Sequence, residues 1–463
     1  MQHQGISVPF IRGLLLLSLA VGYIINVFFH ESLTFLLIAF VILIFFVSWP
    51  GMAPLPRIIS ILMMIVGHFL FFLHGGTKAY WIESLLNNVG LIALFVSVPL
   101  LAYPLQNGGY IGYINKIIGQ FMKKDMQVIA LVVALTGITS SFINLGSVRI
   151  IFDLFFQRLG KMKKIFVKSM IQGFSLAALW SPYFAGVAII LHLVGVRFNS
   201  FVGYGLMMAV LCFSISVALI SLDLRKEKQQ KAYQEMAAAS EAEQTATEKE
   251  PISYRKGLEL LIVFAGLFLS LIFLEKWLHF DVVLLIALIA FTYPIIWSLF
   301  IKKIKAFTHS LKDYVFNVVP NIHNESVMII AATFFTQMVQ LTSFPDLLSK
   351  MFLQISQLSV VLVVAIILVV SLSVSFFTHQ VLPIFVFATS LSPEVVGLKP
   401  ELFALTLILC WGIQPLLSPI AATNLLVGSI FRTKTFEITQ WNVKYVLTVI
   451  LVASFAISVM NSF

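Results

Sequence analysis

The stretch LSPIAATNLLVGSI at 417–430 decides the fold, because it interrupts an apolar run long enough to cross a membrane. A related stretch, WSPYFAG at 180–186, interrupts an earlier run in the same way. Proline removes an intrahelical hydrogen bond and frees a carbonyl, so we predict that both helices break, at Ser181-Pro182 and at Ser418-Pro419. Inside a membrane such a break survives only where it is buried in protein or lines a wet cavity.

The chain around these breaks has the composition of a polytopic membrane protein. Its 463 residues are 60% hydrophobic and 11% charged, whereas soluble domains carry roughly 25% charged residues. This balance excludes a soluble enzyme, a disordered chain and a fibrous repeat. The net charge of +10 is explained by Lys and Arg in cytoplasmic loops, so we expect the lipid bilayer as a partner and no nucleic acid. Cys212 and Cys410 lie in apolar runs and indicate neither a disulfide framework nor a metal site.

Apolar runs predict an all-α fold with many membrane spans, since one span needs about 20 mostly apolar residues. Two stretches, 126–157 and 358–391, are each too long for one span and carry a polar cluster near the middle. The other runs are predicted spans, of which the fifth and the tenth are long and broken: 11–29, 32–49, 57–74, 86–104, 165–197, 201–222, 257–275, 280–300, 325–341, 401–431 and 443–461.

Polar, low-complexity residues at 223–256 divide the chain into nearly equal halves, and their basic start predicts a cytoplasmic linker. The basic clusters at 302–312, 116–124 and 158–168 are placed in the cytoplasm by the same rule. The chain is then cytoplasmic both before and after 126–157, so we predict a re-entrant hairpin there. By the same count of crossings, the chain lies outside both before and after 358–391, so we predict that this stretch is a hairpin that enters from outside. We expect a multi-pass protein of the cell (inner) membrane.

The two halves share an order of motifs. SSFIN at 140–144 precedes the first break by about as many residues as SFFTHQ at 375–380 precedes the second. The copies begin on opposite sides of the membrane, so we predict two inverted-topology repeats, as found in secondary transporters. The predicted division has N-terminal scaffold helices at 1–85, a first repeat at 86–222, the linker at 223–256, scaffold helices at 257–309 and a second repeat at 310–463.

These motifs resemble those of the ion transporter superfamily, which includes divalent-anion/sodium symporters and arsenite-efflux-type carriers. The stretch at 417–430 resembles the second-repeat signature of that group, and TSSFIN at 139–144 resembles its first hairpin tip. The resemblance covers roughly 86–222 and 310–463. It implies a scaffold domain, a moving transport domain and a homodimer.

Polar residues at the two tips and the two breaks form the candidate site, because neutral oxygens suit Na⁺ or the polar groups of a substrate. Arg149 is a cation in an apolar context and a candidate to bind an anionic substrate; the alternative is a structural pair with Asp153. His379 is a candidate for proton coupling. The predicted substrate-binding residues are Ser141, Asn144, Arg149, Ser181, Thr378, His379, Gln380, Ser418, Thr423 and Asn424. The predicted ion-coupling residues are Ser140, Asn144, Asn424 and His379.

These features predict secondary active transport of a small anion or anionic metabolite by alternating access, coupled to Na⁺ or H⁺. The alternatives are a cation/proton antiporter or metalloid exporter on the same scaffold, and a flippase for a lipid phosphate. An enzyme is not expected, because the sequence has no HExxH, no paired-Asp metal motif and no GxSxG. We expect no cofactor, with Na⁺ considered only as a coupling ion.

Overall fold

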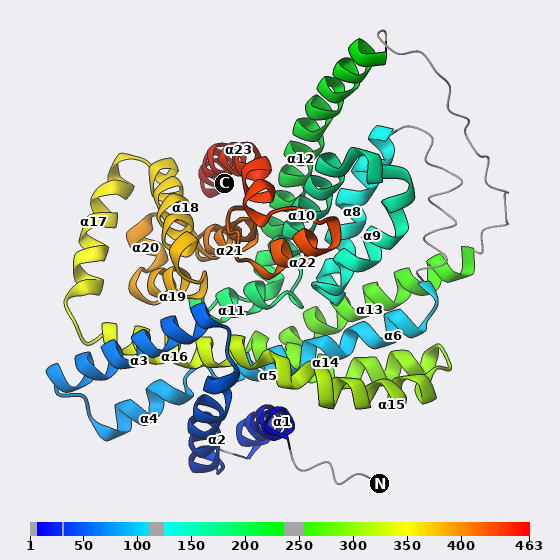
Figure 1. The fold of residues 1–463 in the computed structure, drawn as a ribbon. Coiled ribbons are helices and arrows are strands. Elements are labelled where there is room, and N and C mark those ends of the chain that lie inside the picture. Colours follow the sequence, from blue (N-terminus) through cyan, green and yellow to red (C-terminus); the bar gives the residue numbers. More distant parts are fainter. Residues whose placement is uncertain (1–6, 30–31, 111–124, 236–253) are drawn as a thin grey trace.

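The computed structural model describes residues 7–29, 32–110, 125–235 and 254–463. Within these ranges every regular element is helical (Figure 1). Twelve helices or joined helices in the described residues are long and apolar enough to cross a membrane. The chain is therefore an all-α, multi-pass membrane protein, as its composition predicts.

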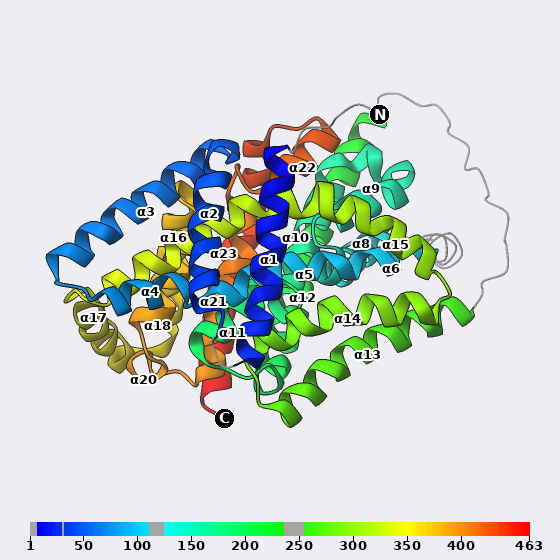
Figure 2. The same ribbon diagram turned by 90° about the horizontal axis from the view of Figure 1, so that it is seen from below.

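Figure 1 shows two bodies, one above the other. In the lower body, α1 and α2 run steeply across α3, α4 and α5 (Figure 2). Part of its core is built around Leu16, Ile92 and Phe334, which are fully buried. The helices of the lower body are α1 (Val8–Phe28), α2 (Thr34–Ser48), α3 (Pro54–Leu73), α4 (Lys78–Leu86), α5 (Val89–Ser97), α6 (Ala102–Asn107), α13 (Tyr254–Leu278), α14 (Val282–Phe300), α15 (Ile304–Asp313) and α16 (His323–Val339).

The upper body holds both predicted hairpins and both predicted breaks. Its core includes the fully buried Phe166, Phe385 and Phe403, and buried residues of α13 and α14 extend that core toward the lower body. The helices of the upper body are α8 (Asp125–Ile143), α9 (Gly146–Leu159), α10 (Lys163–Trp180), α11 (Ala185–Val194), α12 (Phe198–Glu235), α17 (Phe344–Leu358), α18 (Val360–Phe377), α19 (Val381–Ser390), α20 (Pro393–Val396), α21 (Pro400–Leu417), α22 (Ala422–Phe431) and α23 (Thr435–Asn461).

Both Ser-Pro pairs interrupt a helix, as predicted. Helix α10 ends at Trp180 and α11 begins at Ala185, while α21 ends at Leu417 and α22 begins at Ala422. The serine of each pair has extended backbone, with ψ of 120° at Ser181 and 112° at Ser418. The proline therefore stops each helix where the missing amide predicts.

Each of the two long apolar stretches is a pair of helices. The first pair is α8 and α9, joined at Asn144-Leu145, and the second is α18 and α19, joined at Thr378–Gln380. Helices α8 and α18 are each long and apolar enough to cross a membrane, whereas α19 is shorter. The polar clusters of the sequence therefore mark helix ends, which we call the first tip and the second tip.

The predicted span 86–104 lies within a segment that is long and apolar enough to cross a membrane, Lys78–Asn107, and this segment consists of several short helices. Asn88 precedes the first turn of α5, and Pro99 lies in a short 3₁₀ turn, Val98–Leu101, that separates α5 from α6. The prolyl ring prevents the regular helix from continuing through this point. Of the predicted linker, α12 reaches Glu235, and 236–253 lies outside the described residues, as do the basic residues at 116–124.

Candidate functional site

The first tip is held together by its own polar groups. Asn144 has a φ of 52°, in the left-handed region that Asn tolerates better than most residues. The Asn144 carbonyl accepts hydrogen bonds from the amide of Ser147 at 3.1 Å and from its hydroxyl at 2.6 Å. The Ser147 hydroxyl also lies 2.6 Å from the hydroxyl of Ser140. Ser140 therefore stabilises the tip, while Asn144 is exposed.

The first break is hydrogen-bonded to the first tip. The hydroxyl of Ser181 donates to the carbonyl of Ser141 over 3.0 Å, and both residues are buried. Next to this bond, Tyr183 donates its hydroxyl to the Leu267 carbonyl of α13 at 2.8 Å. The ring of Phe142 at the tip stacks on Phe264 of the same helix at 4.2 Å. Tip and break are thus fixed together against α13.

The second half has a matching contact made by a different side chain. Gln414, in α21 just before the second break, donates its amide to the carbonyl of Ser375 near the second tip at 3.2 Å. Asn424 closes the break itself, because its amide donates to the carbonyls of Pro415 at 2.7 Å and Ser418 at 2.8 Å. Pro419 has no amide to donate to the Pro415 carbonyl four residues earlier, so the side chain of Asn424 satisfies that carbonyl. The Ser418 carbonyl also accepts from the amide of Ala421 at 3.1 Å.

At the second tip, the side chain of His379 accepts a hydrogen bond from a backbone amide. Its ring Nδ1 accepts a hydrogen bond from the amide of Val381, in the first turn of α19, at 3.3 Å. In this arrangement Nδ1 carries no proton, because only an unprotonated ring nitrogen accepts. The neighbouring Thr378 donates its hydroxyl to the Val374 carbonyl at 2.8 Å.

Three predicted site residues in the second half hold buried oxygens without a partner in the described part of the chain. The atoms are Gln380 Oε1, Thr423 Oγ1 and Asn424 Oδ1. Thr423 and Asn424 are at most 3% exposed. Buried polar atoms in native proteins are nearly always hydrogen-bonded. These oxygens are therefore acceptors that a cation or a donor group of a solute would satisfy.

The two broken helices pack on each other. A Cβ added at Gly186, just after the first break, would lie 2.6 Å from the ring of Trp411, just before the second. A Cβ at Gly412 would lie 3.2 Å from the Ser175 carbonyl of α10 and 3.3 Å from Ala178 Cβ. Glycine lets the backbones approach closely at both points. The packing of α10 and α11 on α21 therefore links the two halves near both breaks.

Three half-helices begin beside these breaks and tips without a side-chain cap. They are α9, α11 and α22, whose N-cap positions are Leu145, Phe184 and Ala421. The first amides of a helix have no intrahelical acceptor, and the helix dipole adds partial positive charge at this end. Each of these ends therefore favours an anion.

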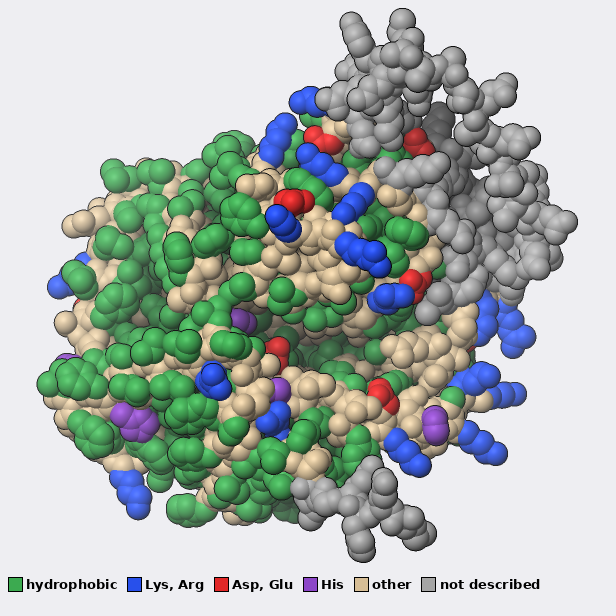
Figure 3. Space-filling view, viewed as in Figure 1, with side chains coloured by type: hydrophobic (Ala, Val, Ile, Leu, Met, Phe, Trp, Pro, Cys, Tyr) green, Lys and Arg blue, Asp and Glu red, His purple; other side chains and the backbone are tan. Residues whose placement is uncertain are grey.

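A cavity of about 270 Å³, which we call the tip cavity, adjoins the first tip and the first break. Figure 3 shows a hollow across the middle of this face, between the two bodies. The tip cavity is lined by Asn144 and Gly146 of the tip, by Tyr183 and Ala185 of the break, and by residues of the lower body that include Asp313. Sequence reasoning missed Asp313, which lies about 170 positions from the tip and carries no motif.

Arg149 and His192 have partners outside the tips. Arg149 is exposed and pairs with Asp153 at 3.2 Å, the alternative that its spacing allowed. Its predicted contact with an anion stays a prediction. His192 is 2.8 Å from Asp281 and 3.1 Å from Asn88, so it joins the end of α11 to the lower body.

No protein-family model matches the chain, and no curated protein matches it. Among the described residues, no group of three or more His, Cys, Asp or Glu is placed to hold a metal ion.

Proposed function

We propose that this membrane protein is a secondary active transporter that moves a small anion or anionic metabolite by alternating access, coupled to Na⁺ or H⁺. The observation that carries the proposal is the tip-to-break contact present in each half, Ser181 to the Ser141 carbonyl and Gln414 to the Ser375 carbonyl. Irregular backbone of this kind, placed twice in the same order, is a feature of carriers built from inverted repeats. The proposal makes the chain a carrier and not an enzyme.

The proposed architecture has two inverted-topology repeats with re-entrant hairpins, as the parity of basic loops predicts. The resemblance to the ion transporter superfamily supports this architecture, and on that resemblance we also propose a homodimer in the cell (inner) membrane. Helix α19 supports a hairpin because its 10 residues are too few to cross a bilayer alone.

An anionic substrate is supported by the uncapped starts of α9, α11 and α22. The coupling ion is supported by the unpaired oxygens of Thr423 and Asn424, which suit Na⁺, and by His379. Protonation of His379 at Nδ1 would break its bond to the Val381 amide. A proton bound at Nδ1 therefore leaves the Val381 amide at the start of α19 without this acceptor. A local change of this kind can couple proton binding to movement of the helix.

A cation/proton antiporter or metalloid exporter is the second candidate, favoured by one observation. Asp313 lines the tip cavity, whereas no Lys or Arg is among the described residues that line it. A carboxylate without a neighbouring cation suits a cationic or neutral solute better than a dianion.

The test is thermal stability of the purified chain with carboxylates, phosphates, oxyanions, organic cations and lipid phosphates, in NaCl and in KCl, at two pH values. A ligand that binds only the folded state adds about 2.7 kcal/mol at one hundred times its Kd. We expect one class of small anion to raise the midpoint. We expect Asn424→Ala to abolish this shift and Asn199→Ala, at an exposed site on α12, to keep it.

A shift caused by cations alone would move the assignment to the antiporter, and a shift caused by lipid phosphates alone would move it to the flippase. A shift that survives Asn424→Ala would contradict the proposed site.

A further inference from the structure

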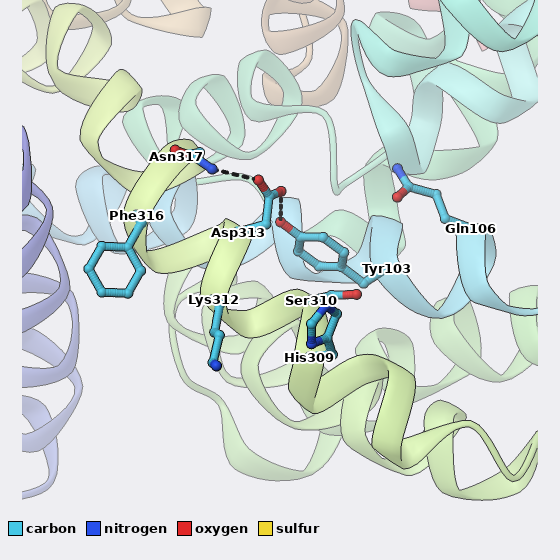
Figure 4. Close-up of a pocket in the computed structure, with 8 residues that line it drawn as sticks. All are labelled: Tyr103, Gln106, His309, Ser310, Lys312, Asp313, Phe316 and Asn317. Atoms are coloured by element: carbon cyan, nitrogen blue, oxygen red, sulfur yellow. Dashed lines mark hydrogen bonds between the residues drawn. The ribbon is translucent and has the colours of Figure 1, made fainter. Parts of the chain in front are cut away.

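A second cavity of about 470 Å³ adjoins the tip cavity, and we call it the vestibule. Both cavities are lined by Tyr103, Gln106 and Asp313, which form a neck between them. On the vestibule side the lining continues through His309, Ser310, Lys312, Phe316 and Asn317 (Figure 4). On the other side it continues to the first tip.

The carboxylate of Asp313 is held at this neck by two neutral donors. Tyr103 donates its hydroxyl to Oδ2 at 3.1 Å, and Asn317 donates its amide to Oδ1 at 2.9 Å. The neighbouring Lys312 points away from the carboxylate (Figure 4). Asp313 forms no ion pair with any residue that the structure describes. Its negative charge is therefore oriented by hydrogen bonds without being neutralised.

The backbone after Asp313 is unusual and fixed in place. Helix α15 passes into a π-helical turn, Tyr314–Val318, and such turns occur often at functional sites. The Tyr314 hydroxyl donates to the Val96 carbonyl of α5 at 2.6 Å, and its ring meets that of Tyr103 edge to face. This anchor holds the turn against α5 and the 3₁₀ turn beside α6, so the neck has a defined shape.

The charges along the two cavities change at the neck. The vestibule contains Lys312 and the titratable His309, whereas the described lining of the tip cavity contains Asp313 as its one charged residue. A fixed charge near low-dielectric walls concentrates ions of opposite sign and repels those of the same sign. The other titratable groups near the carboxylate are the phenols of Tyr103 and Tyr314.

From this juxtaposition we infer that the vestibule and the tip cavity form one aqueous route to the first tip, and that Asp313 makes its neck selective for cations. The inference rests on the proposed function and extends it. The route is the path of the coupling cation. An anion meets a repulsive neck until a cation or proton neutralises Asp313, so the cation binds first.

Charged thiol reagents test the route without knowledge of the substrate. Ala185→Cys places a thiol in the tip cavity, and Ser310→Cys places one in the vestibule alone. The native Cys212 and Cys410 are each 1% exposed and stay in the full-length chain, with the unmodified protein as background. The rate of labelling by a cationic methanethiosulfonate is divided by the rate for an anionic one of similar size.

We expect both thiols to be labelled and the cation preference to be larger at Ala185→Cys than at Ser310→Cys. Asp313→Asn should lower the preference at Ala185→Cys roughly ten-fold, because one lost charge affects the two reagents in opposite directions. Asp313→Glu should restore it. Asp346→Asn, which removes an exposed carboxylate on α17, should leave it unchanged.

Labelling at Ser310→Cys without labelling at Ala185→Cys would overturn the route. Equal preferences at the two thiols, or a preference that survives Asp313→Asn, would overturn the role of Asp313. The comparison of the two thiols needs no change at position 313, so it holds even if Asp313→Asn does not fold. Labelling does not require transport, so a failed ligand panel with the expected labelling would reject the proposed function and keep the route.

Discussion

Gly186→Ala should destabilise the protein because this glycine lies where the two broken helices cross. An added Cβ would be 2.6 Å from Cδ1 and Cγ of Trp411, about 0.8 Å closer than ordinary contact at 3.4 Å. The indole ring is 6% exposed, so it has little room to move away. Overpacking of this kind costs about 1–3 kcal/mol.

Gly203→Ala is the matched control, since a Cβ at Gly203 on α12 meets nothing within 4 Å. That variant should be neutral or should gain up to about 1 kcal/mol from helix propensity. We expect Gly186→Ala to be less stable than Gly203→Ala by about 1–3 kcal/mol, measured by denaturant unfolding of the purified protein in detergent.

Replacing the Trp411 ring by a smaller side chain tests whether contact with that ring causes the loss of stability. In a double-mutant cycle with Trp411→Leu, the penalty of Gly186→Ala should shrink, with a coupling of about 0.5–3 kcal/mol. Equal stabilities of the Gly186 and Gly203 variants, or a coupling of zero, would refute the packing of α11 on α21 at this point.

Three further outcomes follow from single contacts. Ser181→Ala should cost about 0.5–1.5 kcal/mol in the same unfolding assay, because it removes the bond to the Ser141 carbonyl, whereas Ser221→Ala at an exposed site should cost less. Asp223→Asn should cost about 3–5 kcal/mol and more than Lys168→Met, because it leaves the 6%-exposed Lys168 charge unpaired, and similar losses in the two variants would contradict this. Burial alone would raise the pKa of Asp281, but the His192 contact and the amides of Val283 and Leu284 hold it below its usual value. The lowered pKa gives stability that is present above about pH 4 and lost as the pH falls through the folded-state value. Thermal midpoints between pH 6 and 3 should therefore fall more steeply in the wild type than in Asp281→Asn.

The helices and their interruptions could be predicted because they depend on local sequence. Apolar length sets the spans, and the Ser-Pro pairs at Pro182 and Pro419 each mark a helix end, whereas Pro294 and Pro415 lie inside continuous helices. The span 86–104 is confirmed as part of the membrane-capable segment Lys78–Asn107, but its interruptions at Asn88 and Pro99 were not predicted, because apolar residues surround these turn signals.

The site was predictable only in part, because partners far apart in sequence leave no local signal. Ser181 and Ser141 could be named as polar residues in apolar runs, but their hydrogen bond depends on how α8 packs against α10. Asp313 reaches the tip cavity from a helix of the lower body. In the sequence it cannot be distinguished from any other charged residue at a helix end. For Arg149 the spacing allowed both an anion contact and the pair with Asp153, and only the pair depends on local geometry.

Labelling of the hairpin ends from each side of the membrane tests the central claim of two inverted repeats most directly. Single cysteines at Met126 and Lys164 flank the first helix pair, and cysteines at Ser359 and Glu394 flank the second. We predict that an impermeant reagent labels the first two from the cytoplasmic side only and the last two from the outside only. Labelling of the two ends of either helix pair from opposite sides would contradict the inverted repeats and the carrier built on them.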